Sequence, residues 1–355
     1  MAGVDRAPPG EMTATSRKPL SVIRRHYAWL AGLALVGLVL VVSLLLWGTE
    51  MGFPTTVSTS EIPTAGGDSI TLERTVREVT SGAIDDAVNR ITKDGSWLFD
   101  GLSAAVDVVL VRIENGLKWV PWPAIVTGLA VLSFAAGGWR LVGFTAAALL
   151  FVGFMDLWEN MIDTIALMVV AVVIAVLGGL PLGILSSRSQ LADNLMRPIL
   201  DAMQTMPSFV YLLPGILAFG LGKPAGIFAT IIYAIPPVIR LTSLGIRQVP
   251  GETIEAVRSF GASPLQILTK VQIPMALPTI MAGINQTTLM ALSMVTIASM
   301  VAAGGLGDNV LRALQKNEPG NGAIAGLSIV FLAIIIDRLT QAVSRSRQEM
   351  LRSVG

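Results

Sequence analysis

The residues with the clearest chemical potential lie in a polar loop, 251–274, between two long apolar segments. Pro250-Gly251-Glu252 is typical of a helix start, because a carboxylate in the first turn is favoured by the helix dipole. Gly261 would end that helix, since glycine adopts the left-handed backbone conformation without strain. Ser263-Pro264 would open a second helix, because proline fits the first helical turn. The loop is therefore predicted to fold as helix, glycine elbow, helix.

Such a loop offers a rigid surface on which another protein could dock. The alternative is a plain connection, but two capped short helices exceed what a connection needs. We interpret the loop as a docking element. Its candidate contact residues are Glu252, Glu255, Ala256, Phe260, Gly261, Pro264 and Pro274.

A second group of residues could line a path through a membrane. Pro207 interrupts an apolar segment, and irregular backbone at membrane depth is tolerated only beside protein or water. Phe209 and Tyr211 could offer aromatic faces to a cationic group. The alternative for this segment is ordinary packing of Met and aromatic side chains. The candidate path residues here are Met203, Gln204, Met206, Pro207, Phe209 and Tyr211.

Polar side chains also interrupt the long apolar run 275–303. Buried amides need hydrogen-bond partners. Asn285 and Gln286 either bond to a neighbouring helix or face a watered pathway, and the sequence leaves both alternatives open. Ser293 and Thr296 extend the same candidate path.

The composition excludes several kinds of site. The chain has no cysteine and one histidine, His26, so thiolate or histidine metal centres and histidine catalysis are not expected. A net charge of +1 gives no broad electrostatic case for nucleic acid. Gly222-Lys223 lacks the other residues of a phosphate-binding P-loop. We predict no catalytic residue, no metal site and no cofactor in this chain.

The elements that position these residues are predicted to be membrane spans. Of 355 residues 53% are hydrophobic, more than one soluble core of this size can hide. A transmembrane helix needs about 20 mostly apolar residues. Eight candidate spans follow, at roughly 27–47, 122–138, 141–157, 160–184, 205–221, 224–243, 275–303 and 322–341.

Basic residues set the expected orientation. Arg24 and Arg25 precede the first span, and arginines recur in the loop 240–258 and in the tail 343–355. The positive-inside rule then places both termini in the cytoplasm. The first span could instead be read as a signal peptide, but no small-residue cleavage motif follows it.

The region before the second span is expected to lie outside. We predict a cytoplasmic tail over 1–26, an added span over 27–48 and an external linker over 49–95. Residues 96–120 are amphipathic and predict an interfacial helix, with Leu98, Leu102, Val106, Val109, Ile113 and Leu117 on its apolar face and Asp100, Asp107 and Glu114 opposite. The alternative is a helix of a small external domain.

Three acidic residues lie near the junction of the predicted spans 141–157 and 160–184, namely Asp156, Glu159 and Asp163. An acid at the bilayer centre costs roughly 2.5–3.5 kcal/mol on insertion scales. We place the three acids in an outer turn; the alternative is an intramembrane proton relay.

The loop resembles the "EAA" loop of ABC importer permeases, which reads E-A-A, three residues, G, nine residues and I-x-L-P. Here Glu255-Ala256-Val257, Gly261 and Val271-Gln272-Ile273-Pro274 keep that spacing. "PILDAMQTMP" (198–207), "IPPVIRLTSLGIRQVP" (235–250) and "PTIMAGINQT" (278–287) extend the likeness. Together, residues 96–345 resemble permease subunits of glycine betaine/proline betaine ABC importers, the ProW type.

The resemblance implies an all-α, polytopic helical bundle of the ABC type I importer kind, with a permease core over 121–342. It implies alternating access in a homodimer of permease chains, coupled through loop 251–274 to a cytoplasmic ATPase subunit that holds ATP and Mg. An external binding protein would deliver a small methylated amine across the bacterial inner membrane. Choline, carnitine and trimethylamine N-oxide importers share this permease type. An ion-coupled carrier or a membrane scaffold are the alternative functions.

Overall fold

The computed structural model describes the backbone of residues 56–63 and 69–353 and the side chains of 76–90 and 92–342. The chain forms two compact units, 1–85 and 86–355. The predicted tail 1–26 and the first predicted span lie outside the described residues.

In the first unit, two strands replace part of the segment predicted to be a linker. Strand β1 (Thr56–Pro63) pairs antiparallel with β2 (Ser69–Thr75), and helix α2 (Val76–Asp94) follows, beginning in the first unit and ending in the second. Both strands are rich in Thr, Ile and Ser. Thr and Ile favour extended backbone, which outweighs the loop-like composition of the surrounding sequence.

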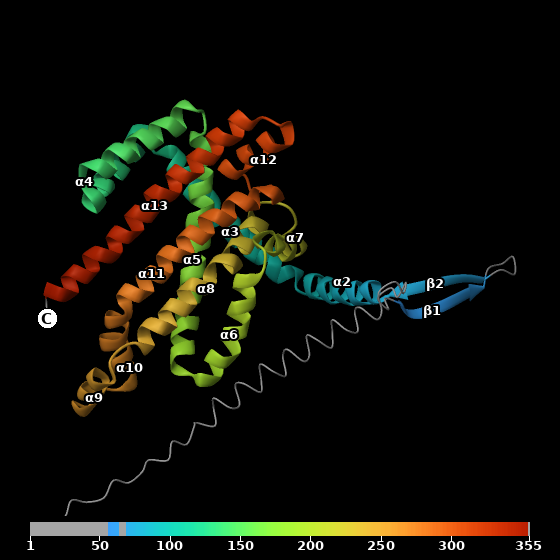
Figure 1. Cartoon of the computed structure of the whole chain (residues 1–355), viewed down its shortest axis with the longest axis horizontal. Coiled ribbons are helices and arrows are strands. Elements are labelled where there is room, and N and C mark those ends of the chain that lie inside the picture. Colours follow the sequence, from blue (N-terminus) through green and yellow to red (C-terminus); the bar gives the residue numbers. More distant parts are fainter. Residues whose placement is uncertain (1–55, 64–68, 354–355) are drawn as a thin grey trace, which may run out of the picture. The chain divides into compact units, whose positions relative to one another are not determined.

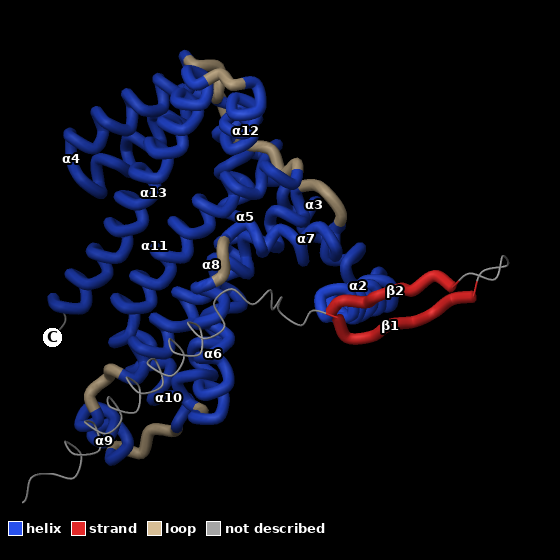
Figure 2. The backbone as a smooth tube through the Cα atoms, turned by 45° about the vertical axis from the view of Figure 1, so that its right-hand side comes forward, coloured by secondary structure: helices blue, strands red, loops and turns tan. Residues whose placement is uncertain are grey.

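The second unit is helical throughout its described residues, apart from turns. Helices α9 and α10 lie at one end of the bundle, here called the loop end, and α12 lies at the other, the α12 end (Figures 1 and 2). The helices are α3 (Ser96–Trp119), α4 (Trp122–Phe154), α5 (Trp158–Arg188), α6 (Gln190–Thr205), the 3-10 turn η1 (Ser208–Tyr211), α7 (Leu212–Phe219), α8 (Lys223–Arg247), α9 (Gly251–Ser259), α10 (Pro264–Ile267), the π-turn η2 (Leu268–Gln272), α11 (Ile273–Ala298), the 3-10 turn η3 (Ser299–Val301), α12 (Leu306–Lys316) and α13 (Pro319–Ser353).

Five described helical runs are long and apolar enough to cross a membrane: α4, α5, α8, the run containing α11, and α13. Helix α6 and the segment 208–219 would form a sixth span, bent by 113°. The predicted polytopic helical bundle is confirmed. The predicted span 205–221 covers only the second part of this bent pair, whose first helix, α6, starts at Gln190.

Helix α4 turns back on itself at Gly138, where φ is +68°. The hydroxyl groups of Ser133 and Thr145 are 2.8 Å apart, although twelve residues separate them in sequence. In a straight helix they would be about 18 Å apart, at roughly 1.5 Å per residue. The two arms, 122–137 and 139–154, therefore run antiparallel, as the predicted pair of spans requires. Each arm is about 24 Å long, shorter than a hydrocarbon core of roughly 30 Å.

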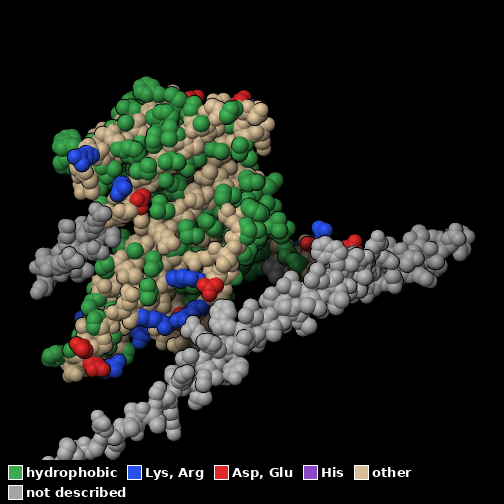
Figure 3. Space-filling model, viewed as in Figure 1, with side chains coloured by type: hydrophobic (Ala, Val, Ile, Leu, Met, Phe, Trp, Pro, Cys, Tyr) green, Lys and Arg blue, Asp and Glu red, His purple; other side chains and the backbone are tan. Residues whose placement is uncertain are grey.

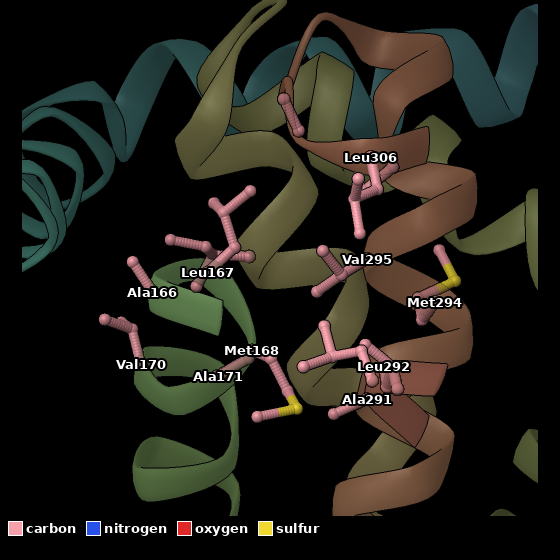
Figure 4. Close-up of a cluster of buried hydrophobic side chains, with 14 of the residues drawn as sticks. Ala166, Leu167, Met168, Val170, Ala171, Ala291, Leu292, Met294, Val295 and Leu306 are labelled. Carbon is pink, nitrogen blue, oxygen red and sulfur yellow. The ribbon is translucent and has the colours of Figure 1, made fainter. Parts of the chain in front are cut away.

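The core of the bundle lies where α5, α8 and α11 meet. Side chains of α5 face those of α11, and Met168 points toward Ala291 and Leu292 (Figure 4). Helix α8 packs against both. Small residues allow the close approach: a Cβ placed on Gly183 of α5 would lie 2.6 Å from the Thr242 side chain of α8. Close packing of small residues is the usual basis of helix association in membranes.

Helix α3 confirms the predicted amphipathic helix, and Val106, Ile113 and Leu117 of its apolar face pack against the core, but Glu114 of the opposite face is buried. Leu110 is fully buried and Glu114 is 6% exposed, whereas Leu98 and Leu102 are exposed. The Lys223 ammonium group, at the start of α8, donates to both carboxylate oxygens of Glu114 at 2.7 and 2.8 Å. The seven-residue spacing of Asp100, Asp107 and Glu114 predicts that Glu114 lies on the polar face. Spacing within one helix cannot reveal that Lys223, far along the chain, is its partner.

Asp156 and Glu159 lie at the α4–α5 turn, and Asp163 lies in the second turn of α5; placement of the three acids in an outer turn stays a prediction. Asp156 and Glu159 are exposed, and Asp156 borders a cavity of about 310 Å³ that is also lined by Arg312 of α12. Asp163 forms an ion pair with Lys118 of α3, 2.8 Å long. This interaction raises the pKa of the Lys118 ammonium group above its ordinary value.

Candidate functional site

The docking loop folds as the sequence predicts. Helix α9 begins at Gly251, with Pro250 as its N-cap and Glu252 in its first turn, and ends at Ser259. None of its residues is buried, and Glu255 and Ala256 are both exposed. Thr253, Ile254 and Val257 on its inner side are half-buried, so the exposed outer face, with Glu255 and Ala256, is the one free to be covered by another molecule.

The elbow between the two short helices depends on the backbone of Gly261. Its φ is +81°, a left-handed conformation that costs an ordinary L-residue about 1–2 kcal/mol. Its N–H group donates to the Arg258 carbonyl at 2.9 Å, and the Ala262 N–H donates to the Val257 carbonyl at 3.4 Å. No atom lies within 4 Å of an added Cβ, so the constraint at Gly261 is conformational and not steric.

The second short helix, α10, starts with a reciprocal cap. The Gln266 N–H donates to the Ser263 hydroxyl at 3.4 Å, and the Ser263 N–H donates to the Gln266 side chain at 2.8 Å. Pro264 occupies the first helical turn. Pro274 lies outside this short helix, in the first turn of α11 beyond the π-turn. The elbow is thus held by local bonds on both sides.

Large apolar side chains project from this polar loop. Phe260 is 92% exposed and Leu265 is 67% exposed. Exposed apolar groups rimmed by charges mark interaction surfaces. Sequence reasoning selected Phe260 and missed Leu265, whose only signal is an apolar side chain directly after the Pro264 of a helix start. Several basic side chains gather toward the loop end on the face seen in Figure 3.

The inner side of the loop faces the ends of α5 and α8. A cavity of about 390 Å³ lies there, lined in part by Arg188, Arg247, Arg258 and Pro264. The Arg188 guanidinium group donates to the Pro264 carbonyl at 3.5 Å, a long bond that joins α5 to α10. A basic side chain of α5 thus contacts the loop, and Arg258 of the loop lines the same cavity.

The predicted break in the path segment is present at Pro207, between α6 and η1. Gln204, Met206 and Phe209 are exposed around it. Tyr211 is buried, and its hydroxyl donates to the carbonyl of Met203, which ties the two sides of the bend together. Its ring packs edge-to-face on Tyr233, with centroids 5.8 Å apart.

The two aromatic candidates, Phe209 and Tyr211, differ in exposure. Phe209 is 61% exposed. Tyr211 is enclosed by the bundle in this conformation and stabilises the bend instead. A role for Phe209 in contacting a cation stays a prediction.

Helix α11 presents its polar residues on different sides. The Asn285 amide donates to Asp337 of α13 at 3.1 Å and accepts from the Thr340 hydroxyl. Gln286 is exposed, and so is Ser293 seven residues later. Residues seven apart lie on one face of a helix. Asn285 therefore fits the alternative of bonding between helices, whereas Gln286 and Ser293 share an uncovered stripe.

Thr296, the last candidate on α11, is partly buried. Its hydroxyl donates to the carbonyl of Leu292 in its own helix, at 3.1 Å. Within the described part of the chain, no three His, Asp or Glu side chains gather as a metal site would need.

Comparison with known proteins identifies the family. Residues 179–349 match the family described as "Binding-protein-dependent transport system inner membrane component". The glycine betaine/proline betaine transport system permease protein ProW of Escherichia coli K12 is 48% identical over 248 residues, which are 70% of this chain and 70% of that protein. The glycine betaine/carnitine transport permease protein GbuB of Listeria monocytogenes is 43% identical, over 71% of this chain and 92% of that protein.

Among solved structures, an inward-facing MetNI methionine ABC transporter matches 52% of this chain and 93% of its own, at 23% identity and a TM-score of 0.48. The sequence relatives alone decide the assignment, because the identity to ProW extends over more than two thirds of both chains. The chain belongs to the family of binding-protein-dependent transport system inner membrane components.

Proposed function

We propose that this chain is the pathway-forming permease subunit of an ATP-driven importer for small methylated amines. The observation that carries the proposal is the capped helix–elbow–helix loop at one end of a membrane bundle, with Phe260 and Leu265 exposed on it. A chain of this family needs a partner to supply energy. The loop is the surface of this chain best suited to receive that partner.

The proposed partners follow from the two ends of the bundle. A cytoplasmic ATPase subunit, which holds ATP and Mg, docks on α9 and α10. An external binding protein docks at the α12 end. Two copies of this chain form the pathway between them, and the uncovered stripe of Gln286 and Ser293 on α11 supports that arrangement, since polar groups do not favour lipid.

The proposed substrate class comprises glycine betaine, proline betaine, choline, carnitine and trimethylamine N-oxide. Two relatives are named for glycine betaine together with proline betaine or carnitine. The exposed ring of Phe209 supports a weak site for a methylated ammonium group, worth about 0.5–2 kcal/mol. A weak site in the permease suits a system in which the binding protein selects the substrate.

An ion-coupled carrier is the second candidate, and one observation favours it. Asp337 is an acidic residue within the apolar part of α13, held by the amides of Asn285 and Gln341 at 3.1 and 2.8 Å. Carboxylates at membrane depth often serve ion or proton pathways. The exposed docking loop has no role in such a carrier, which is why the importer is preferred.

Reconstitution distinguishes the two functions. The chain is co-purified with its ATPase subunit, placed in vesicles, and supplied with binding protein and radiolabelled glycine betaine. We expect uptake that requires ATP on the loop side and that persists when sodium and proton gradients are collapsed. Uptake driven by either gradient without ATP would favour the carrier and contradict the proposal.

Orientation is tested by cysteine labelling, which has no background because the native chain has no cysteine. Gln315 at the end of α12 and Lys270 beside α10 are both exposed. In intact cells a membrane-impermeant thiol reagent should label Gln315→Cys and leave Lys270→Cys unlabelled until the membrane is opened. The reverse pattern would invert the proposed topology.

A further inference from the structure

A buried carboxylate lies near the loop end, in the first turn of α6. The Asp193 side chain is 7% exposed. It accepts a hydrogen bond from the Ser186 hydroxyl of α5 at 2.8 Å. It also forms ion pairs with Arg197 of its own helix at 2.6 Å and with Arg247 of α8 at 3.1 Å. One carboxylate thus joins three helices.

Arg247 completes the junction from the opposite side. It is the last residue of α8, and its guanidinium group donates to the backbone carbonyl of Ser186 as well as facing Asp193. Ser186, Asp193 and Arg247 are together called the junction triad. They connect the end of α5, the start of α6 and the end of α8.

The junction triad is also adjacent to the docking loop. Helix α9 begins at Gly251, only a short turn after Arg247. The cavity of about 390 Å³ behind the loop is lined by Arg247 together with Ile254 of α9 and Ile267 of α10. A displacement of the loop must therefore be accommodated at Arg247 before it reaches the remainder of α8.

We propose that Arg247 and Asp193 are positioning residues that carry movement of the docking loop into α6. The inference rests on the proposed function and specifies how its loop acts on the path. Asp193 is buried, so its separation from Arg247 is costly, because a carboxylate in a medium of low polarity would lose one of its two cationic partners. When α9 moves, α6 follows, and the far end of α6 is the bend at Pro207.

A second ion pair between the same two helices provides the matched control. Arg240 of α8 pairs with Asp201 of α6, but their side chains are 38% and 66% exposed. Neither residue borders the cavity behind the loop. Exposed pairs contribute little because water screens the charges. The acids of the two pairs differ in burial, with Asp193 7% and Asp201 66% exposed, whereas the arginines are similar at 32% and 38%. Of the four residues, only Arg247 borders the cavity behind the loop.

The experiment measures substrate imported per ATP hydrolysed in vesicles that contain the full complex. Arg247→Met should retain ATP hydrolysis and lower this ratio about tenfold, the factor that corresponds to about 1.4 kcal/mol. Arg240→Met should leave the ratio unchanged. Arg247→Lys, which keeps a charge for Asp193, should restore most of the loss. A normal ratio in Arg247→Met, or an equal loss in Arg240→Met, would overturn the proposal.

A paired variant covers the case in which Arg247→Met does not assemble. Asp193→Asn with Arg247→Gln removes both charges, so no carboxylate is left buried without its partner. This variant should assemble and still show the low ratio; a normal ratio would contradict the proposal. Unmutated complex and Gly261→Val are measured alongside. If unmutated vesicles show no ATP-driven uptake, the proposed function fails; if they do and the junction variants behave normally, only the junction role fails.

Discussion

Replacing Gly261 by valine should abolish most ATP-driven uptake while leaving the chain inserted in the membrane. The left-handed φ of +81° costs an ordinary residue about 1–2 kcal/mol, and β-branching adds to that strain. The elbow would then adopt another conformation, and α9 and α10 would no longer present Phe260 and Leu265 together. We expect uptake to fall at least about tenfold, the factor that corresponds to about 1.4 kcal/mol.

The control for this prediction is Gly261→Asn, because asparagine tolerates the left-handed conformation better than other residues with side chains. An added Cβ meets no atom within 4 Å, so size alone should not matter. Uptake and ATP hydrolysis are measured in vesicles, with membrane content checked by immunoblot. Uptake that is equally low in both variants would show that side-chain size matters, and unimpaired uptake in Gly261→Val would refute the elbow's role.

The second large effect is expected at Gly183, where α5 crosses α8. A Cβ there would lie 2.6 Å from Thr242 and 2.8 Å from the Ile239 carbonyl, and backbone atoms cannot easily move aside. Gly183→Val should separate the two helices, at a cost of about 1–3 kcal/mol or more. We expect a large loss of the folded fraction in size-exclusion chromatography and a lower thermal midpoint.

Gly178 provides the comparison on the same helix. Its added Cβ would be 3.7 Å from Ile235, an ordinary contact distance. Gly178→Val should therefore remain folded, although it makes the same change in composition and helix propensity. If the two variants were equally stable, the close contact at Gly183 would not be what limits the packing of α5 on α8.

The sequence allowed most of the local structure to be predicted. The helix start at Pro250, the Gly261 elbow and the Ser263 cap depend on neighbouring residues, so their signals lie within a few positions. The break at Pro207 was predictable for the same reason, because proline cannot continue the hydrogen-bonding of a helix. These features needed no knowledge of distant contacts.

What could not be predicted depends on partners far along the chain. Glu114 was placed on the polar face of its helix, but Lys223 at the start of α8 holds it in a buried ion pair. Tyr211 was a candidate for a free aromatic face, but Tyr233 and the Met203 carbonyl enclose it. Asp193 carried no motif at all. Its burial follows from the meeting of three helices, which spacing in one segment cannot show.

The hairpin of α4 has a consequence for the order in which the chain is assembled. Helix α4 packs chiefly on α13, and Phe144 and Phe151 of its second arm lie edge-to-face with the Phe331 ring, with centroids 5.8 and 5.5 Å away. Helix α4 precedes α13 in the chain and is therefore synthesised before it. Until α13 is present, the face of the hairpin that packs on it is uncovered. The hydrogen bond between Ser133 and Thr145 pairs the two hydroxyl groups within the hairpin, so they need no other partner during that time. The α4 hairpin is therefore covered only after α13 has been synthesised.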